Sequence, residues 1–120
     1  MTKLTKQIVI DAKELIKEPQ RWSKGGAVTR EKSGDSSYCL GGALAYAATG
    51  DATTMYEPEL RWLFWEFVRK SGLEVFFASY MEAPELYEPE FLVYLFNDSS
   101  VTEHTDVLGL LDKTLETYDE

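Results

Sequence analysis

Four polar residues have the chemical types found in a cysteine-dependent active site. Cys39 is the single cysteine and His104 the single histidine of the chain, and Asn97 and Asp98 precede His104 by only a few residues. A thiol nucleophile needs a base within hydrogen-bond reach and an amide or carboxylate that orients the base. Cys39 also falls at a predicted helix start, where free backbone amides lower a thiol pKa. These four residues are therefore candidates for a hydrolase or transferase site.

The same residues have a structural interpretation, and it is the favoured one. Cysteine is among the most often buried residue types, and Cys39 is followed by Leu40 and a Gly-Gly-Ala-Leu segment. Asn97 and Asp98 open an Asn-Asp-Ser-Ser segment whose side chains can bond backbone amides. His104, in a predicted first helical turn, is expected to face solvent. On this interpretation the protein is not an enzyme and Cys39 is buried and unreactive.

No sequence motif indicates a metal or a cofactor. One cysteine and one histidine are too few for a structural zinc site. The pairs Gly25-Gly26 and Gly41-Gly42 lack the spacing and the lysine of a phosphate-binding loop. We therefore expect neither a metal site nor a bound cofactor.

The charge of the chain is strongly uneven. The 120 residues have a formal net charge of −9, but residues 1–70 contain 11 Lys and Arg against 9 Asp and Glu. Residues 71–120 contain 12 Asp and Glu and a single basic residue, Lys113. A negative field repels phosphate backbones and attracts basic protein surfaces. The charge therefore argues against direct nucleic-acid binding and favours a basic protein partner.

Residues 73–98 combine this acidity with many aromatic side chains and contain no lysine or arginine. Aromatic residues and methionine are enriched at the centres of interfaces, and Pro84 and Pro89 should keep the segment between them out of a long regular element. We therefore predict a docking surface for a basic partner. Its predicted members are Tyr80, Met81, Glu82, Glu85, Leu86, Tyr87, Glu88 and Glu90. The alternative is a solvated acidic surface that only aids solubility.

The elements that would position these residues are mostly helical. Apolar residues recur at helical spacing in residues 5–17, from residue 39 to Gly50, from Pro58 to Gly72 and in residues 103–117. Ser36 or Ser37 is expected to cap the second of these helices. A capping box at residues 100–103 is expected to start the last one. Trp22 should pack against the core just after the first helix.

Two parts of the chain are less regular. Residues 27–30 read as a short extended piece and residues 33–37 as a turn, which fits a small hairpin. Residues 73–81 and 91–96 are apolar runs that could be either strand or helix. The expected fold is mainly α, with α+β as the alternative: a compact bundle of four or five helices with a small β element, forming one domain over residues 1–120.

The cellular setting is also constrained by the sequence. No stretch approaches the roughly 20 apolar residues of a membrane-spanning helix, and charged residues interrupt the N-terminal segment, unlike a signal peptide. We therefore expect a cytoplasmic protein with no membrane contact.

Three segments taken together suggest a family. They are Trp22 followed by Gly26-Ala27, the helix start Cys39-Leu40-Gly41-Gly42-Ala43-Leu44, and Asn97-Asp98 before the last helix. This order resembles a family of uncharacterised domains from bacteria, particularly actinobacteria, and their phages. The chain departs from the family pattern at Phe96, where a tryptophan is expected, and in the length of residues 73–95.

The resemblance implies a compact fold and a bacterial or phage origin, but no reaction. Small acidic proteins of phage type can act by occupying a basic surface, such as the nucleic-acid groove of a host enzyme. With the charge distribution, this makes a binding or inhibitory protein the first functional expectation. The alternatives are a small-molecule binding domain around Trp22, Cys39 and Asn97, and a cysteine-dependent enzyme that uses Cys39 and His104.

Overall fold

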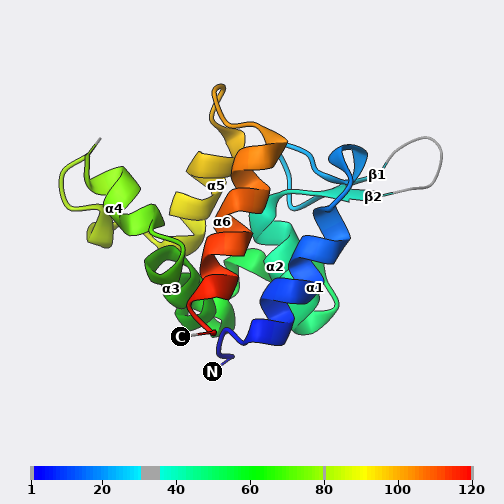
Figure 1. Cartoon of the computed structure of the whole chain (residues 1–120), viewed down its shortest axis with the longest axis horizontal. Helices are drawn as coiled ribbons and strands as arrows, with labels where there is room; N and C mark the ends of the chain where they lie inside the picture. The colour runs from blue at the N-terminus through cyan, green and yellow to red at the C-terminus, as the bar shows by residue number, and fades with distance from the viewer. Residues whose placement is uncertain (1, 31–35, 80, 120) are drawn as a thin grey trace.

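Helices form most of the structure, a computed structural model that describes residues 2–30, 36–79 and 81–119. Within these residues there are six α-helices, four 3-10 helices and one two-stranded sheet (Figure 1). The α-helices are α1 (Lys6–Ile16), α2 (Leu40–Thr49), α3 (Arg61–Lys70), α4 (Leu73–Ala78), α5 (Pro89–Asp98) and α6 (His104–Glu116). The shorter elements are η1 (Pro19–Arg21), η2 (Ala52–Tyr56), η3 (Pro58–Leu60), η4 (Pro84–Leu86), β1 (Val28–Arg30) and β2 (Ser36–Tyr38). The prediction of a mainly α fold with a small β element is confirmed.

Helix α2 is the buried centre of the fold. Its first six residues are all buried, and it packs against α1, α5 and η2. Small side chains at Gly41, Gly42 and Ala43 give this helix a narrow profile, which lets neighbouring backbone approach closely. The helix ends at Gly50, whose φ of 85° is a left-handed conformation that favours glycine.

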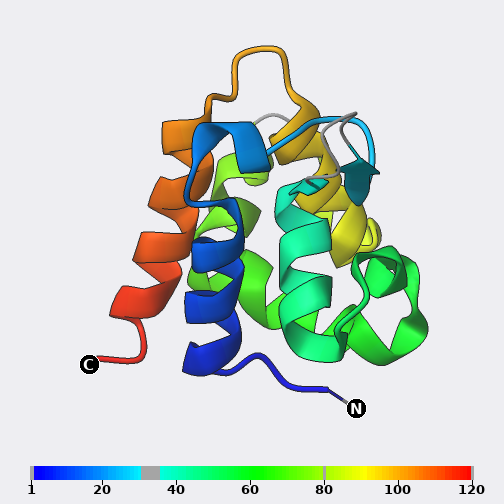
Figure 2. The ribbon, with the colours of Figure 1, turned by 90° about the vertical axis from the view of Figure 1, so that its right-hand side faces the viewer.

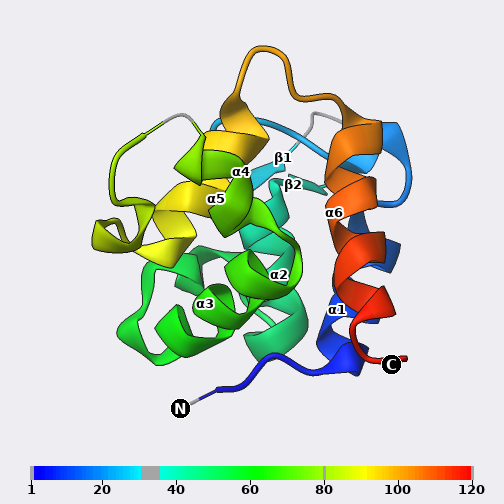
Figure 3. The ribbon, with the colours of Figure 1, turned by 60° about the vertical axis from the view of Figure 1, so that its left-hand side comes forward.

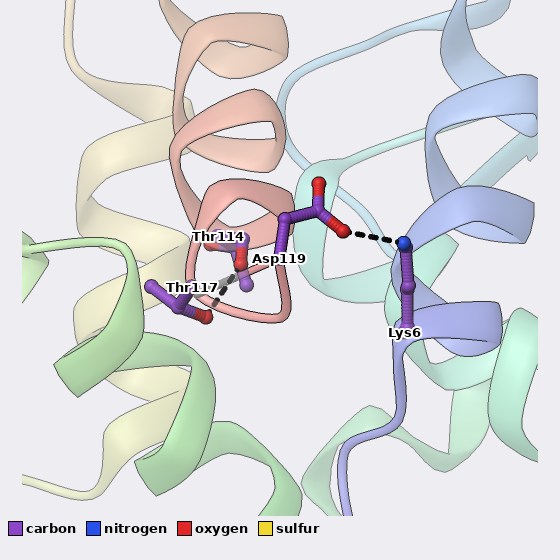
Figure 4. Close-up of polar contacts among 4 residues, drawn as sticks. All are labelled: Lys6, Thr114, Thr117 and Asp119. Atoms are coloured by element: carbon purple, nitrogen blue, oxygen red, sulfur yellow. Dashed lines mark hydrogen bonds and ion pairs between the residues drawn. The ribbon is translucent and has the colours of Figure 1, made fainter.

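Helices α1 and α6 lie side by side along one flank of the molecule (Figure 2). One exposed ion pair joins them, from Lys13 Nζ to Asp112 at 2.5 Å. A second runs from Lys6 Nζ of α1 to Asp119, which follows α6, at 2.6 Å (Figure 4). Exposed pairs of this kind contribute little to stability. The apolar contacts of Val9, Ala12, Ile16, Val107 and Leu111 with the core therefore hold the two helices in place.

Helices α3, α4 and α5 form the other side of the molecule (Figure 3). Gly72, with φ of 83°, turns the chain from α3 into α4. Of the two segments that could have been strand or helix, residues 73–78 form α4 and residues 91–96 lie within α5, so helix is the outcome in both. In α5 the buried apolar residues Leu92, Val93 and Phe96 recur at helical rather than alternating spacing.

The hairpin is present, but the predicted cap of α2 is wrong. Strands β1 and β2 pair antiparallel, with Val28 opposite Tyr38. Ser36 and Ser37 belong to β2, so Cys39 becomes the N-cap of α2 instead. Residues 33–35 of the predicted turn lie outside the described residues.

The start of α6 differs from the predicted capping box by three residues. Glu103 is the N-cap, and the Asp106 carboxylate accepts a hydrogen bond from the Glu103 amide at 2.8 Å. Residues 99–102 form the preceding turn, in which the Thr102 amide donates to the Ser99 carbonyl. In the described part of the chain, no helix is long and apolar enough to cross a membrane.

Candidate functional sites

The side chain of Asn97 lies at a polar junction between three distant parts of the chain. Its Oδ1 accepts hydrogen bonds from Trp22 Nε1 at 2.6 Å and from the Leu40 amide at 2.9 Å. Its Nδ2 donates to the Ser23 carbonyl at 3.1 Å and to the Asp98 carboxylate at 2.8 Å. The amide therefore ties the end of α5 to the start of α2 and to the segment after η1.

These four bonds use the full hydrogen-bonding capacity of the Asn97 amide. A carboxamide oxygen has two lone pairs and the amide nitrogen has two hydrogens, and each has a protein partner. Asn97 is also fully buried. This side chain has no free hydrogen-bond donor or acceptor with which to orient a catalytic base or hold a ligand, so its geometry suits a structural role.

The junction extends to the surface through Asp98 and Lys24. Asp98 Oδ2 accepts a hydrogen bond from the Gly25 amide at 2.9 Å, and Lys24 Nζ donates to the Ser99 carbonyl at 2.6 Å. Trp22 is half-buried and packs against the core, as the sequence predicted. The bonds fix the loop that follows η1 onto the end of α5.

Close backbone packing continues the junction at the start of α2. The Ala27 carbonyl accepts a hydrogen bond from the Cys39 amide at 3.3 Å. A Cβ atom added to Gly42 would overlap this carbonyl oxygen and lie 2.7 Å from the carbonyl carbon. Only glycine therefore fits at residue 42 while Ala27 keeps its place.

Cys39 is buried, with 2% of its surface exposed, and its thiol belongs to the same packing. Sγ accepts a hydrogen bond from the Gly42 amide at 3.1 Å and lies 4.0 Å from Met55 Sδ. Burial raises the pKa of the Cys39 thiol, and this effect exceeds the lowering by the Gly42 amide. The thiol is therefore protonated at neutral pH, which is the opposite of an activated nucleophile.

His104 is half-buried rather than facing solvent, and it is held by α1. Its Nε2 lies 2.7 Å from the Ile16 carbonyl, which can only accept, so Nε2 carries a hydrogen. The imidazole ring also packs against Trp22 at 5.8 Å between centroids. His104 thus links the end of α1 to the start of α6. The four hydrogen bonds of Asn97 go to other groups, so Asn97 does not orient the His104 ring.

A second region, the acidic aromatic surface, is defined here as residues 81–91. Leu86, Tyr87 and Phe91 are 82%, 42% and 37% exposed. The Tyr87 and Phe91 rings stack at 6.0 Å between centroids, and Phe91 stacks on Tyr94 at 6.1 Å. Exposed apolar side chains gathered in this way are characteristic of binding surfaces.

The carboxylates of this surface have different environments. Glu82 and Glu88 are exposed, and Glu88 forms an ion pair with Arg61 at 3.3 Å. Met81 is half-buried and packs against the core. Tyr80 and the side chain of Glu85 lie outside the described residues.

Glu90 was expected on the exposed face, and this expectation is wrong. Its side chain is only 2% exposed because the first turn of α5 directs it towards α3, where Arg61 lies 3.9 Å away. Burial raises the pKa of the Glu90 carboxyl, and the neighbouring Glu88 adds to this effect. Glu90 therefore belongs to the packing between α3 and α5 and cannot contact a partner directly.

Comparison with known proteins identifies the family. A family model described as a family of unknown function, DUF6197, matches residues 1–117. The chain belongs to this family. No curated protein and no solved structure matches it.

In this DUF6197 chain, the three segments that suggested a family meet in space. Trp22 and Asn97 share a hydrogen bond, and Asn97 also binds the amide of Leu40, next to Cys39. The sequence offered Cys39 and Asn97 as catalytic candidates and predicted that Trp22 packs on the core. It did not indicate the hydrogen bond between Trp22 and Asn97 or the close contact of Gly42 with Ala27. Within the described residues, no group of three or more His, Cys, Asp or Glu side chains could hold a metal ion.

A thiol reagent tests the alternative in which Cys39 is a nucleophile. We expect native protein to react with DTNB at least about 100-fold more slowly than the unfolded protein, because Cys39 is buried and its thiol protonated. Labelling is followed at 412 nm with and without denaturant. Rapid stoichiometric labelling of the native chain would restore the cysteine-enzyme hypothesis.

Proposed function

We propose that this protein is a non-enzymatic binding protein that docks onto a basic surface of another protein through its acidic aromatic surface. The observation that carries the proposal is the exposure of Leu86, Tyr87 and Phe91 beside the exposed carboxylates of Glu82 and Glu88. Apolar and aromatic side chains supply most of the affinity of an interface, whereas the surrounding charges select the partner and speed association.

The sequence around this surface supports the choice of a basic partner. Residues 71–110 contain eight Asp and Glu and neither lysine nor arginine. Arg61 reaches Glu88 from α3 and offsets part of the local charge. The remaining negative field favours a partner rich in lysine and arginine, such as the nucleic-acid groove of a bacterial enzyme.

A charge-reversal pair with a matched control tests the proposal. The double variant Glu82→Lys and Glu85→Lys reverses two negative charges within residues 81–91. The control Glu14→Lys and Glu18→Lys changes net charge equally at exposed residues in and just after α1, at the opposite end of the molecule (Figure 1). Each protein is immobilised and exposed to a bacterial lysate at low and high salt, and bound proteins are identified by mass spectrometry.

We expect the wild-type and control proteins to retain the same basic protein at low salt and to release it at high salt. The Glu82/Glu85 variant should lose this capture, and its association rate with the purified partner should fall by about tenfold or more. Equal losses in both double variants would mean that net charge alone drives capture. That result would remove the basis for a defined docking surface.

A further inference from the structure

An apolar pocket lies beside the acidic aromatic surface, at the place where α4 meets the end of α5. Its cavity volume is 270 Å³, and it is lined by Phe76, Phe77, Leu95, Phe96, Ser99, Val101 and Thr102. Two of its walls reach the surface, since Val101 is 80% and Phe76 43% exposed. The pocket is therefore open to a group that approaches from solvent.

The size of the pocket favours one large apolar side chain over a small-molecule ligand. Pockets that enclose small molecules typically have volumes of about 300–1,000 Å³ and a few converging polar groups. The cavity here is smaller, and its lining is mostly aromatic and aliphatic. Buried apolar anchors in such pockets are typical centres of protein interfaces.

Helix geometry connects the pocket to the docking surface. Phe91 of the acidic aromatic surface and Leu95 of the pocket wall are four residues apart in α5, so they are neighbours on one face of the helix. Tyr87 precedes α5, and its ring stacks on Phe91. From residue 91 to residue 95 the face extends about 6 Å, or roughly one helical turn.

We propose that the pocket receives an apolar anchor residue from a basic amphipathic helix of the partner protein. This inference rests on the proposed function and specifies the partner segment. An amphipathic helix places apolar residues on one face, at spacings that match a groove, and basic residues on the other. Its apolar face would cover Phe91 and fill the pocket, and its lysines and arginines would complement exposed carboxylates such as those of Glu82 and Glu88.

A synthetic helix of leucine and lysine serves as the probe. An 18-residue fluorescent peptide with leucines on one face is compared with a scrambled peptide of the same composition. The pocket variant is Val101→Ser and its matched control is Val75→Ser. Both valines are exposed, at 80% and 76%, but only Val101 lines the pocket. The Glu82→Lys and Glu85→Lys double variant tests the charge in the same assay.

We expect the wild-type protein to bind the amphipathic peptide at least about tenfold more tightly than the scrambled one. Val101→Ser should weaken this binding about tenfold, as the loss of an anchor contact does, and Val75→Ser should change it less than twofold. Hydrogen–deuterium exchange of the unbound variants confirms that each retains the native fold.

The possible failures are distinguishable. If Val101→Ser binds as tightly as Val75→Ser while the charge variant is weakened, the pocket inference is wrong and the proposed docking surface stands. If the charge variant also binds normally, the proposed function fails too. An uncharged apolar dye is titrated in parallel. If Val101→Ser abolishes binding of the dye but leaves binding of the peptide unchanged, the pocket belongs to a small molecule and the inference is overturned.

Discussion

Replacing Asn97 with alanine is expected to lower the free energy of unfolding by at least about 3 kcal/mol. The change leaves the Trp22 indole N–H, the Leu40 amide and the Ser23 carbonyl without their partner. Each buried polar group that loses its hydrogen bond costs about 1–3 kcal/mol. Urea unfolding followed by tryptophan fluorescence and by circular dichroism measures the loss.

The variant Asn97→Asp separates hydrogen bonding from side-chain volume. Aspartate keeps both acceptor bonds of Oδ1 but cannot donate to Ser23, and it places a second carboxylate beside Asp98. We expect this variant to be destabilised at pH 7 and to recover part of the loss at acidic pH, where the carboxyl can be protonated. As a surface control, Ser100→Ala should change stability by less than about 0.5 kcal/mol. A stable Asn97→Ala protein would show that the junction does not hold the fold.

Replacing Gly42 with alanine is expected to be about as damaging as the loss of Asn97. The added Cβ would overlap the Ala27 carbonyl oxygen and lie 2.9 Å from the Ala27 Cα, and backbone atoms cannot move aside as a flexible side chain can. Overpacking of this kind costs about 1–3 kcal/mol and more when backbone must shift. The displacement would also weaken the bond between the Cys39 amide and Ala27.

Two other glycines provide matched controls for this variant. At Gly41 a Cβ would meet the end of the Met55 side chain, which can move, so Gly41→Ala should cost less than Gly42→Ala. Gly109 lies in α6 with open space around it, and Gly109→Ala should raise stability by about 0.5–1 kcal/mol. Thermal unfolding of the three variants should therefore rank them in the order 109, 41, 42. Equal stability at 41 and 42 would contradict the packing described for Ala27.

Much of the fold follows from local pattern in the sequence. The apolar spacing of residues 5–17 predicted α1 to within one residue at each end, because an amphipathic helix that packs on a core must repeat its apolar face. Gly50 and Gly72 were predicted as helix ends, and both have the positive φ that favours glycine. The segments 73–81 and 91–96 were ambiguous because a short apolar run fits either a buried strand or a buried helix.

Tertiary contacts decided the features that the sequence did not predict. The strand β2 uses Ser36 and Ser37 in its ladder, so the cap of α2 moved to Cys39. Glu90 appeared to be a surface carboxylate because the local sequence does not indicate its contact with Arg61, which is 29 residues earlier in the chain. The pocket beside Val101 forms from α4, α5 and the following turn, and no local pattern indicates that these meet.

Hydrogen–deuterium exchange of the protein with its captured partner tests the central claim most directly, because it locates the docking surface without a substitution. Partner binding should slow exchange in residues 73–101, including η4 and the turn before α6, and leave α1 unchanged. Protection confined to α1, or to the junction of Trp22 and Asn97, would contradict this claim.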